Sequence, residues 1–416
     1  MRNFYFITYM KKMAALIAAI MLIMSGCSTA TSNQQQNSPQ NESATSTPAA
    51  GKDKPSSGEE PIKIGVIVPI TGYAALAGES AKKAIELHVE QVNTQGGINV
   101  RKVEIQIADS EGKPEVAARV AEKMISEGVV AIAGPYLTPT SFAVEPIITK
   151  SQVPMISMSG GFQPQGNNHP WSWTVTAGAV HAFTKVFNYM MENGMKRIAT
   201  ITPTDALGDS GDKALKQLFD GEYKGKLEWA GHEKFNLQDI DITAQISKLK
   251  AKEPDLMFVG ASGESIVSIR KQMNQVGMQD IPLATYHSNT TREMIKLIGN
   301  TPGRMLFPAT AANIAKELPD GELKEKAVSY SQAYEKKYGE LPMTTEGLGY
   351  DSIGVIVEAI RAVGPDREKI GEWLRKGQTI VGANQVYKYT PEDHVGGNYT
   401  DLFMVEAEKG QWKSVK

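Results

Sequence analysis

The sequence lacks features that would place it in several common functional classes. Among its 416 residues there is one cysteine, so no internal disulfide can form and the fold must be stabilised by a packed core. The 44 basic residues nearly balance the 46 acidic ones, and a formal net charge of −2 gives no reason to expect binding to nucleic acid or to an anionic surface. Beyond the N-terminal region, no segment is apolar for long enough to span a membrane.

Motifs for catalysis and for metal binding are also lacking. The six histidines show no His-x-x-x-His spacing, and there is neither a Gly-x-x-x-x-Gly-Lys-Ser/Thr loop nor a Gly-x-Gly-x-x-Gly run after a strand. Residues 208–211, Gly-Asp-Ser-Gly, are similar to the nucleophile loop of trypsin-like proteases. They open a predicted helix, however, where Asp209 or Ser210 is a suitable cap. We therefore expect no catalytic residues, no metal and no cofactor.

The single cysteine, Cys27, ends a pattern typical of a secretory signal peptide. Lys11 and Lys12 precede twelve apolar residues, 13–24, which are followed by Ser25 and Gly26. A helix of that length would span only about 18 Å, too short to cross a bilayer. The ending Met-Ser-Gly-Cys resembles the lipobox of bacterial lipoproteins, in which the cysteine is lipidated and becomes the new N-terminus. The alternative is an ordinary core cysteine. We expect residues 1–26 to be a lipoprotein signal peptide, with Met1 or Met10 as the start.

The segment after Cys27 has a composition that does not favour folding. Residues 28–60 are rich in Ser, Thr, Asn, Gln and Pro and contain almost no large apolar groups. Such a stretch cannot bury enough surface to offset the entropy of ordering, so residues 27–60 are predicted to be a lipidated cysteine and a disordered linker. As a flexible coil the linker would reach roughly 30 Å.

From residue 61 onward the sequence alternates between strands and helices, over a length that suggests two domains. Apolar, β-branched runs predict strands, and amphipathic stretches between them predict helices. This alternation is typical of parallel sheets covered by helices on both faces, and there is enough of it for two sheets. Ligands of such sheets lie beyond the carboxyl ends of the strands. The predicted strands are 62–68, 103–108, 129–133, 153–157, 197–202, 227–235, 255–259 and 281–285.

Two loops at predicted strand ends carry groups that suit a ligand. In the first, Thr138 is a good N-cap and Pro139 a good first helical residue, so a helix should begin there. The amides and the positive dipole end of a helix N-terminus suit a carboxylate or phosphate, although an ordinary cap with nothing bound is the alternative. In the second loop, Gly160 and Gly161 follow Ser159 and would allow a ligand to approach the backbone, or would form a plain turn.

Several segments together resemble the branched-chain amino-acid type of ABC-transporter solute-binding protein. The resemblance covers the chain from about residue 61 to its end, and its strength lies in the order and spacing of the segments. They are 62–78, the Gly-Gly-Ile turn at 96–98, Ala108-Asp109, 134–138, 154–159, Tyr350-Asp351-Ser352 and 389–394.

This resemblance implies an α/β fold of the type I periplasmic binding protein class. Two Rossmann-like parallel-sheet lobes would be joined by three crossovers, with the ligand trapped in the cleft between them. The implied N-terminal lobe takes residues 61–179 and about 310–385. The implied C-terminal lobe takes residues 180–309 and about 386–416.

The resemblance also implies how the first lobe meets a ligand carboxylate. Counting along the sequence, Thr138 stands where the leucine/isoleucine/valine-binding members have a hydroxyl residue, and Ser159 and Gly161 stand at their second loop. Gly161 replaces a threonine of the family, so one side-chain hydrogen bond is lost or moves to Ser159. A carboxylate site is still expected.

The second lobe departs further from the family. Val180, Ser262 and His287 occupy the positions of the acidic and tyrosyl groups that surround a ligand ammonium. None of them is a carboxylate, and a desolvated ammonium without an anionic partner costs several kcal/mol. Asp205 or Glu264 could substitute. Aromatic residues expected on cleft-side loops, either as ligand walls or as rim residues, are Tyr73, Tyr136, Phe162 and Tyr286.

The function implied is that of a substrate-binding protein of an ABC importer, tethered by lipid to the outer face of the cytoplasmic membrane. Its ligand would be a small solute with a carboxylate or amide, namely an amino acid or an aromatic or aliphatic analogue. ABC permease subunits would be its partners, and a monomer is expected. A ligand-sensing receptor of the same fold is the alternative, and an extracellular enzyme is disfavoured because no nucleophile–base pair is evident.

Overall fold

The computed structural model describes residues 60–415. The predicted signal peptide, Cys27 and nearly all of the predicted linker lie outside this range. Within it, the chain forms two separate sheets of the α/β kind and one small two-stranded sheet.

The first sheet has five parallel strands in the order β2-β1-β3-β4-β5. Strand β1, which pairs with β2 on one side and β3 on the other, has Ile64, Val66 and Val68 facing one side of the sheet and Ile67 the other, all fully buried. This burial on both faces explains why the strand is rich in isoleucine and valine. The strands are β1 (Ile62–Val68), β2 (Val103–Asp109), β3 (Ile132–Ala133), β4 (Met155–Ser157) and β5 (Ser172–Thr174).

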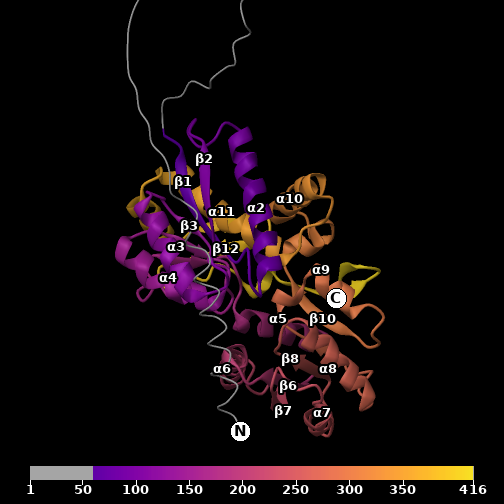
Figure 1. Ribbon diagram of the computed structural model, residues 1–416. Helices are drawn as coiled ribbons and strands as arrows, with labels where there is room; N and C mark the ends of the chain where they lie inside the picture. Colours follow the sequence, from indigo (N-terminus) through magenta and orange to yellow (C-terminus); the bar gives the residue numbers. More distant parts are fainter. Residues whose placement is uncertain (1–59, 416) are drawn as a thin grey trace, which may run out of the picture. The chain divides into compact units, whose positions relative to one another are not determined.

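Helices cover both faces of the first sheet. On one face, α2 (Ala75–Thr94) lies beside α11 (Thr344–Val363), and both contribute buried side chains to the same core (Figure 1). On the other face, α3 (Pro114–Ser126) packs against α4 (Thr138–Ser151). The short helix α12 (Arg367–Arg375) adds Ile370 and Leu374 to the first core.

The second sheet has seven strands in the order β14-β13-β10-β9-β8-β6-β7. The five strands from β10 to β7 are parallel, whereas β13 and β14 run antiparallel at one edge. The expectation of parallel sheets therefore holds for the two large sheets apart from this C-terminal hairpin; the small sheet of β11 and β12 is antiparallel as well. The strands are β6 (Arg197–Pro203), β7 (Glu228–Phe235), β8 (Leu256–Val259), β9 (Leu283–Ala284), β10 (Met305–Ala309), β13 (Phe403–Glu408) and β14 (Gln411–Ser414).

The second sheet is also covered on both faces, by α5 and α6 on one and mainly by α7, α8 and α9 on the other. Its helices are α5 (Ala179–Glu192), α6 (Ala206–Asp220), α7 (Thr243–Lys250), α8 (Glu264–Gln275) and α9 (Arg292–Ile298). Short 3₁₀ turns lie at η1 (His287–Asn289), η2 (Ala311–Glu317) and η3 (Tyr399–Asp401).

The chain passes between the two sheets three times: after β5, after β10 and after the hairpin of β11 (Thr379–Val381) and β12 (Val386–Lys388). The second passage includes α10 (Glu322–Tyr338), which packs its tyrosines against α2. Two α/β lobes joined by three crossovers confirm the predicted fold class.

Candidate functional site

The loops at the carboxyl ends of the first sheet are built around Asp109, the last residue of β2. Its carboxylate accepts hydrogen bonds from the backbone N–H of Ile70 (2.8 Å) and of Thr71 (3.2 Å), and from the hydroxyl of Thr71 (2.6 Å). Burial alone would raise the pKa of Asp109, but these hydrogen bonds outweigh it and hold the pKa below its usual value. The carboxylate therefore fixes the loop that follows β1.

That loop carries Tyr73, one of the aromatic residues predicted for the site. Its side chain is 79% exposed. The ring lies over Gly112, where a Cβ would come within 2.9 Å of Tyr73 Cε1 and within 3.5 Å of Leu137. Tyr73 thus lies next to the loop that leads into α4, as an exposed aromatic residue beside the candidate site.

Thr138 and Ser159 form a close hydroxyl pair on two neighbouring loops. Their oxygens are 2.6 Å apart, and Ser159 is almost fully buried. The prediction that Thr138 caps α4 is wrong by one residue: Leu137 is the N-cap, Thr138 is the first helical residue, and no side chain caps the helix. Because its hydroxyl is not used for capping, Thr138 can turn it toward Ser159.

The glycine at position 161 is what allows this pair to form. A Cβ at Gly161 would lie 2.6 Å from Thr138 Oγ1 and 3.0 Å from Thr138 Cγ2, closer than atoms pack. The residues predicted for the first-lobe side, Thr138, Ser159 and Gly161, are therefore brought together. The absence of a side chain at position 161 is thus coupled to the position that Thr138 adopts.

A second pair joins the first crossover to the second lobe. The hydroxyl of Thr176, just after β5, lies 3.2 Å from Nε2 of His287. His287 is the first residue of η1, the 3₁₀ turn that follows β9. Burial, and to a lesser degree the nearby ring of His181, lowers the pKa of His287 to about 4. The imidazole is therefore neutral at pH 7. Its Nδ1 is buried with no hydrogen-bond partner in the described part of the chain.

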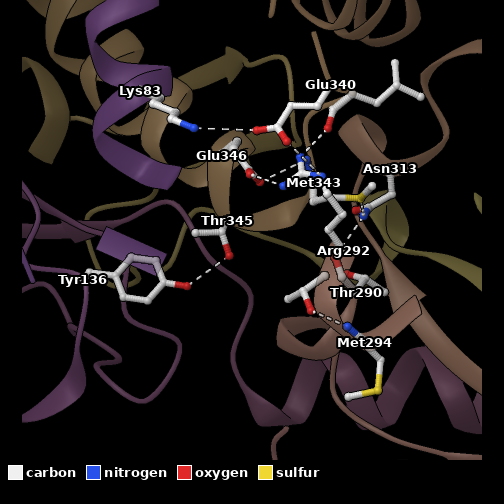
Figure 2. A network of polar contacts seen from close by, with 12 residues as sticks. Lys83, Tyr136, Thr290, Arg292, Met294, Asn313, Glu340, Met343, Thr345 and Glu346 are labelled. Carbon is white, nitrogen blue, oxygen red and sulfur yellow. Dashed lines mark hydrogen bonds and ion pairs between the residues drawn. The ribbon is translucent and has the colours of Figure 1, made fainter. Parts of the chain in front are cut away.

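Tyr136 links the first-lobe loops to the start of α11. Its hydroxyl is 3.2 Å from that of Thr345, and burial raises the pKa of Tyr136 (Figure 2). The adjacent Glu346, only 2% exposed, pairs with Arg292 of α9 at 3.3 Å. The start of α11 thus contacts both lobes, as Figure 2 shows for these residues.

Other predicted residues do not join this cluster. Ser262 and Glu264 are exposed at the start of α8, and the carboxylate of Asp205 caps α6 by accepting from the N–H of Gly208. Phe162 and Tyr286 are core residues rather than walls of a cleft: Phe162 packs on Phe142, and Tyr286 packs between the aromatic rings of the second lobe. Val180 is half-buried near the start of α5.

Some residues of the site had no signal in the sequence. Thr176, Thr345 and Arg292 are ordinary residues whose role depends on contacts with distant parts of the chain. Asp109 did belong to a segment that resembles the family. In residues 60–415, no three His, Cys, Asp or Glu side chains are grouped so that they could hold a metal ion.

Comparisons with known proteins agree with this architecture. The profile described as "Periplasmic binding protein" matches residues 61–411. Among curated proteins, Leu/Ile/Val-binding protein homolog 3 of Brucella melitensis is 26% identical over 349 residues, which are 82% of this chain and 90% of the relative. Leu/Ile/Val-binding protein BraC3 of Rhizobium johnstonii is 24% identical over 353 residues, covering 84% and 92%.

Several solved structures have the same fold as this chain. An extracellular ligand-binding receptor from Rhodopseudomonas palustris superposes with a TM-score of 0.74 at 24% identity, covering 86% of this chain and 99% of the other. The substrate-binding protein LivJ of Streptococcus pneumoniae, in complex with isoleucine, has a TM-score of 0.70 at 22% identity, covering 85% and 98%. At these identities the likeness establishes the fold alone.

The family match also bears on the class of function. Periplasmic binding proteins act outside the cytoplasm and bind solutes rather than convert them, which confirms the expectation that the chain is not an enzyme. Among the helices of residues 60–415, none has the length and apolar character needed to cross a bilayer. With two α/β lobes, three crossovers and a profile match over most of its length, the chain belongs to the periplasmic binding protein family, as a type I member.

Proposed function

We propose that the chain is the substrate-binding protein of an ABC importer and that it captures a small solute bearing a carboxylate or amide. The observation that carries this proposal is the hydroxyl pair of Thr138 and Ser159 at the start of α4. Relatives that span most of the chain are named as Leu/Ile/Val-binding proteins, and one structural neighbour is named as a branched-chain amino acid transporter substrate-binding protein.

The chemistry of the pair suits an oxygen-rich ligand group. A hydroxyl can donate to a carboxylate or a carbonyl, and the first turn of α4 adds free backbone N–H groups and the positive end of the helix dipole. Tyr73 and Tyr136 on the adjoining loops offer aromatic surface to the rest of the ligand. His287 would contribute a neutral imidazole from the second lobe.

The same residues argue against a ligand with a free ammonium group. Of the acidic residues near these loops, Asp205 is used as a helix cap, Glu346 is paired with Arg292, and Glu264 is exposed at the start of α8. Val180, Ser262 and His287 supply no negative charge, and burying an unpaired ammonium costs several kcal/mol. We therefore infer that plain leucine, isoleucine or valine is not the ligand.

The working cycle follows from two lobes and their connections. The lobes, with the boundaries given by the family resemblance, would close on the ligand by a hinge motion, and the closed form would dock on the permease. Lipidation of Cys27 would keep the protein beside the permease and raise its local concentration there. A single acyl chain binds a membrane only marginally, so more than one chain is expected at the anchor.

Ligand-induced stabilisation of the full-length protein tests the proposal. Branched-chain and aromatic amino acids, aromatic acids and short amides are screened for a shift in melting temperature. A ligand at a hundredfold excess over its Kd adds about 2.7 kcal/mol, which is readily measured. A broad panel that gives no shift contradicts the proposal, and tight binding of leucine contradicts the argument from the missing anion.

Thr138→Ala identifies the site of whatever ligand is found. Losing one hydrogen bond to the ligand should weaken binding about tenfold. The matched control is Thr149→Ala on the same helix, because the hydroxyl of Thr149 donates to Glu145 one turn earlier, away from Ser159. Equal affinities of Thr138→Ala and Thr149→Ala would remove Thr138 from the site.

A sensor of the same fold is the second candidate, because three of the structural neighbours are named as extracellular ligand-binding receptors. Binding alone does not separate the two functions. Permease and ATPase genes beside the gene for this chain would favour transport, and a receptor kinase gene would favour sensing.

A further inference from the structure

A cavity of about 360 Å³ lies between α2, α10, α11 and strand β11. None of the residues that form the hydroxyl cluster at the strand ends lines it. Its volume is within the range of small-molecule sites, about 300–1,000 Å³. Figure 1 shows α2, α10 and α11, the three helices that surround it. It is therefore a separate place in the fold where a small molecule can be held.

The walls of the cavity combine apolar surface with polar groups. Val92 of α2, Val355 of α11 and Ile380 of β11 supply aliphatic surface. Nδ1 of His88 is buried there without a hydrogen-bond partner among residues 60–415. Burial lowers the pKa of His88 to about 4, so the ring is neutral at pH 7 and does not repel a cation. The cavity therefore suits an amphipathic ligand.

The positive charges that line the cavity are already paired. The Lys326 ammonium donates to the carbonyl of Val381 at 2.8 Å and pairs with Glu322 at 3.0 Å. The guanidinium of Arg361 pairs with Glu358 at 2.7 Å. An anionic ligand would have to displace one of these partners.

Among the negative charges that line the cavity, one lacks such a partner among the residues that the structure describes. The buried carboxylate of Asp351 accepts from the N–H groups of Ala383 and Asn384 and from the hydroxyl of Tyr387. Glu325, in the first turn of α10, lines the cavity and has no ion-pair or side-chain hydrogen-bond partner in the described part of the chain. The charge left unpaired at the cavity is thus a carboxylate.

We propose that this cavity binds a small organic amine, with its apolar body against Val92, Val355 and Ile380 and its ammonium group toward Glu325. The hydroxyl of Ser329, one helical turn along α10 from Glu325, would accept a further hydrogen bond from the ammonium. The ligand charge is opposite to that of the carboxylate proposed for the cleft, so the two sites take different molecules.

Calorimetric titration of the full-length protein with benzylamine, benzyl alcohol and benzoate tests the proposal. These probes share one ring and differ in charge, and we expect benzylamine to bind most tightly and benzoate not to bind. No binding of benzylamine at millimolar concentration overturns the proposal. Benzoate binding as tightly as benzylamine overturns the assignment of ligand charge.

Two variants locate the bound amine. Glu325→Gln removes the free carboxylate and should weaken binding about two- to fivefold, as expected for an ion pair with an exposed carboxylate. Ser329→Trp, an exposed substitution on α10, should fill the mouth of the cavity and abolish binding. The control Glu335→Gln changes an exposed carboxylate on the same helix that lies outside the cavity and has no ion-pair partner within residues 60–415, and it should have no effect.

Thr138→Ala separates this site from the cleft. Benzylamine binding should be unchanged in Thr138→Ala if the amine occupies the cavity. Weaker binding in Thr138→Ala with none lost in Ser329→Trp would place the amine in the cleft and overturn the proposal, without affecting the proposed transport function.

Discussion

Replacing Arg292 by methionine tests how the two lobes are held together. The Nη1 atom of Arg292 lies 3.3 Å from Oε1 of Glu346, and Nη2 donates to the carbonyl of Leu341 at 2.6 Å (Figure 2). Glu346 is 2% exposed, so the substitution leaves a buried carboxylate without its cation.

The size of the effect follows from this burial. Removing one member of a buried ion pair costs about 3–5 kcal/mol. Here the cost should be about 3 kcal/mol, because the side chain of Arg292 is 23% exposed and Glu346 still accepts from the N–H of Met343 at 3.0 Å. Methionine keeps the aliphatic length of the arginine, so packing is little changed.

Urea denaturation at neutral pH measures this cost as a lower transition midpoint. Lys123→Met is the matched control, because Lys123 and Glu127 form an exposed pair and the loss should stay below about 1 kcal/mol. The double variant Arg292→Met/Glu346→Gln removes the unpaired charge and should regain most of the stability. If Arg292→Met costs no more than Lys123→Met, or if the double variant is no more stable than the single one, the reasoning is refuted.

Three further outcomes are expected. The folded-state pKa of His287, about 4, lies below the unfolded value of 6.5, so its contribution to stability is complete above pH 6.5 and is lost as the pH falls toward 4. His287→Gln should therefore reduce the stability lost in acid by about 3 kcal/mol, as measured by denaturation at a series of pH values. An unchanged dependence of stability on pH would contradict this. Gly161→Ala should weaken ligand binding when made in the wild-type protein but not when made in the Thr138→Ala variant, because the Cβ of the new alanine acts by displacing the Thr138 side chain. If the two substitutions instead have additive effects on the binding free energy, this explanation is wrong. Cys27→Ala should release the protein from membranes into the medium, as seen by fractionation, and continued membrane attachment would disprove the anchor.

The sequence predicted most of the strands because their apolar runs are long. Strand β1 is an example: five of its seven residues are isoleucine or valine, buried on both faces, and only Lys63 among the seven is not fully buried. Strands β5 and β10 were not predicted. Strand β5 has only three residues, too few to show an alternating pattern, and β10 contains Pro308, a residue that disfavours the prediction of a strand.

The C-terminal hairpin was missed although a signal was present. Lys409 and Gly410 have φ values of 51° and 78°, as the two-residue turn between antiparallel strands requires. The Lys-Gly pair between two alternating segments is a weaker form of the usual Asn-Gly pattern. Strict alternation of strands and helices in the rest of the chain favoured parallel strands only.

The candidate site was predictable in its first-lobe half and not in the other. Thr138 and Ser159 follow adjacent strands, and parallel strands bring their carboxyl ends to one edge. Tyr136 and Thr345 are separated by 209 positions, and their contact depends on how α11 returns from the second lobe. No local pattern encodes such a contact. The burial of Phe162 and Tyr286 could not be predicted either, because the side chain of an aromatic residue after a strand can point into the core or into a cleft.

The hydroxyl pair limits what the first lobe can offer a ligand. Thr138 and Ser159 have two hydroxyl protons, and at 2.6 Å one of them lies between the two oxygens. One proton is therefore left to donate outward, whichever residue supplies it. A carboxylate needs several donors, so the backbone N–H groups at the start of α4 must provide the others. This division explains why Thr138→Ala should weaken binding without abolishing it: the contact made by the Thr138 oxygen is lost, whereas the Ser159 hydroxyl and the backbone N–H groups remain for the ligand.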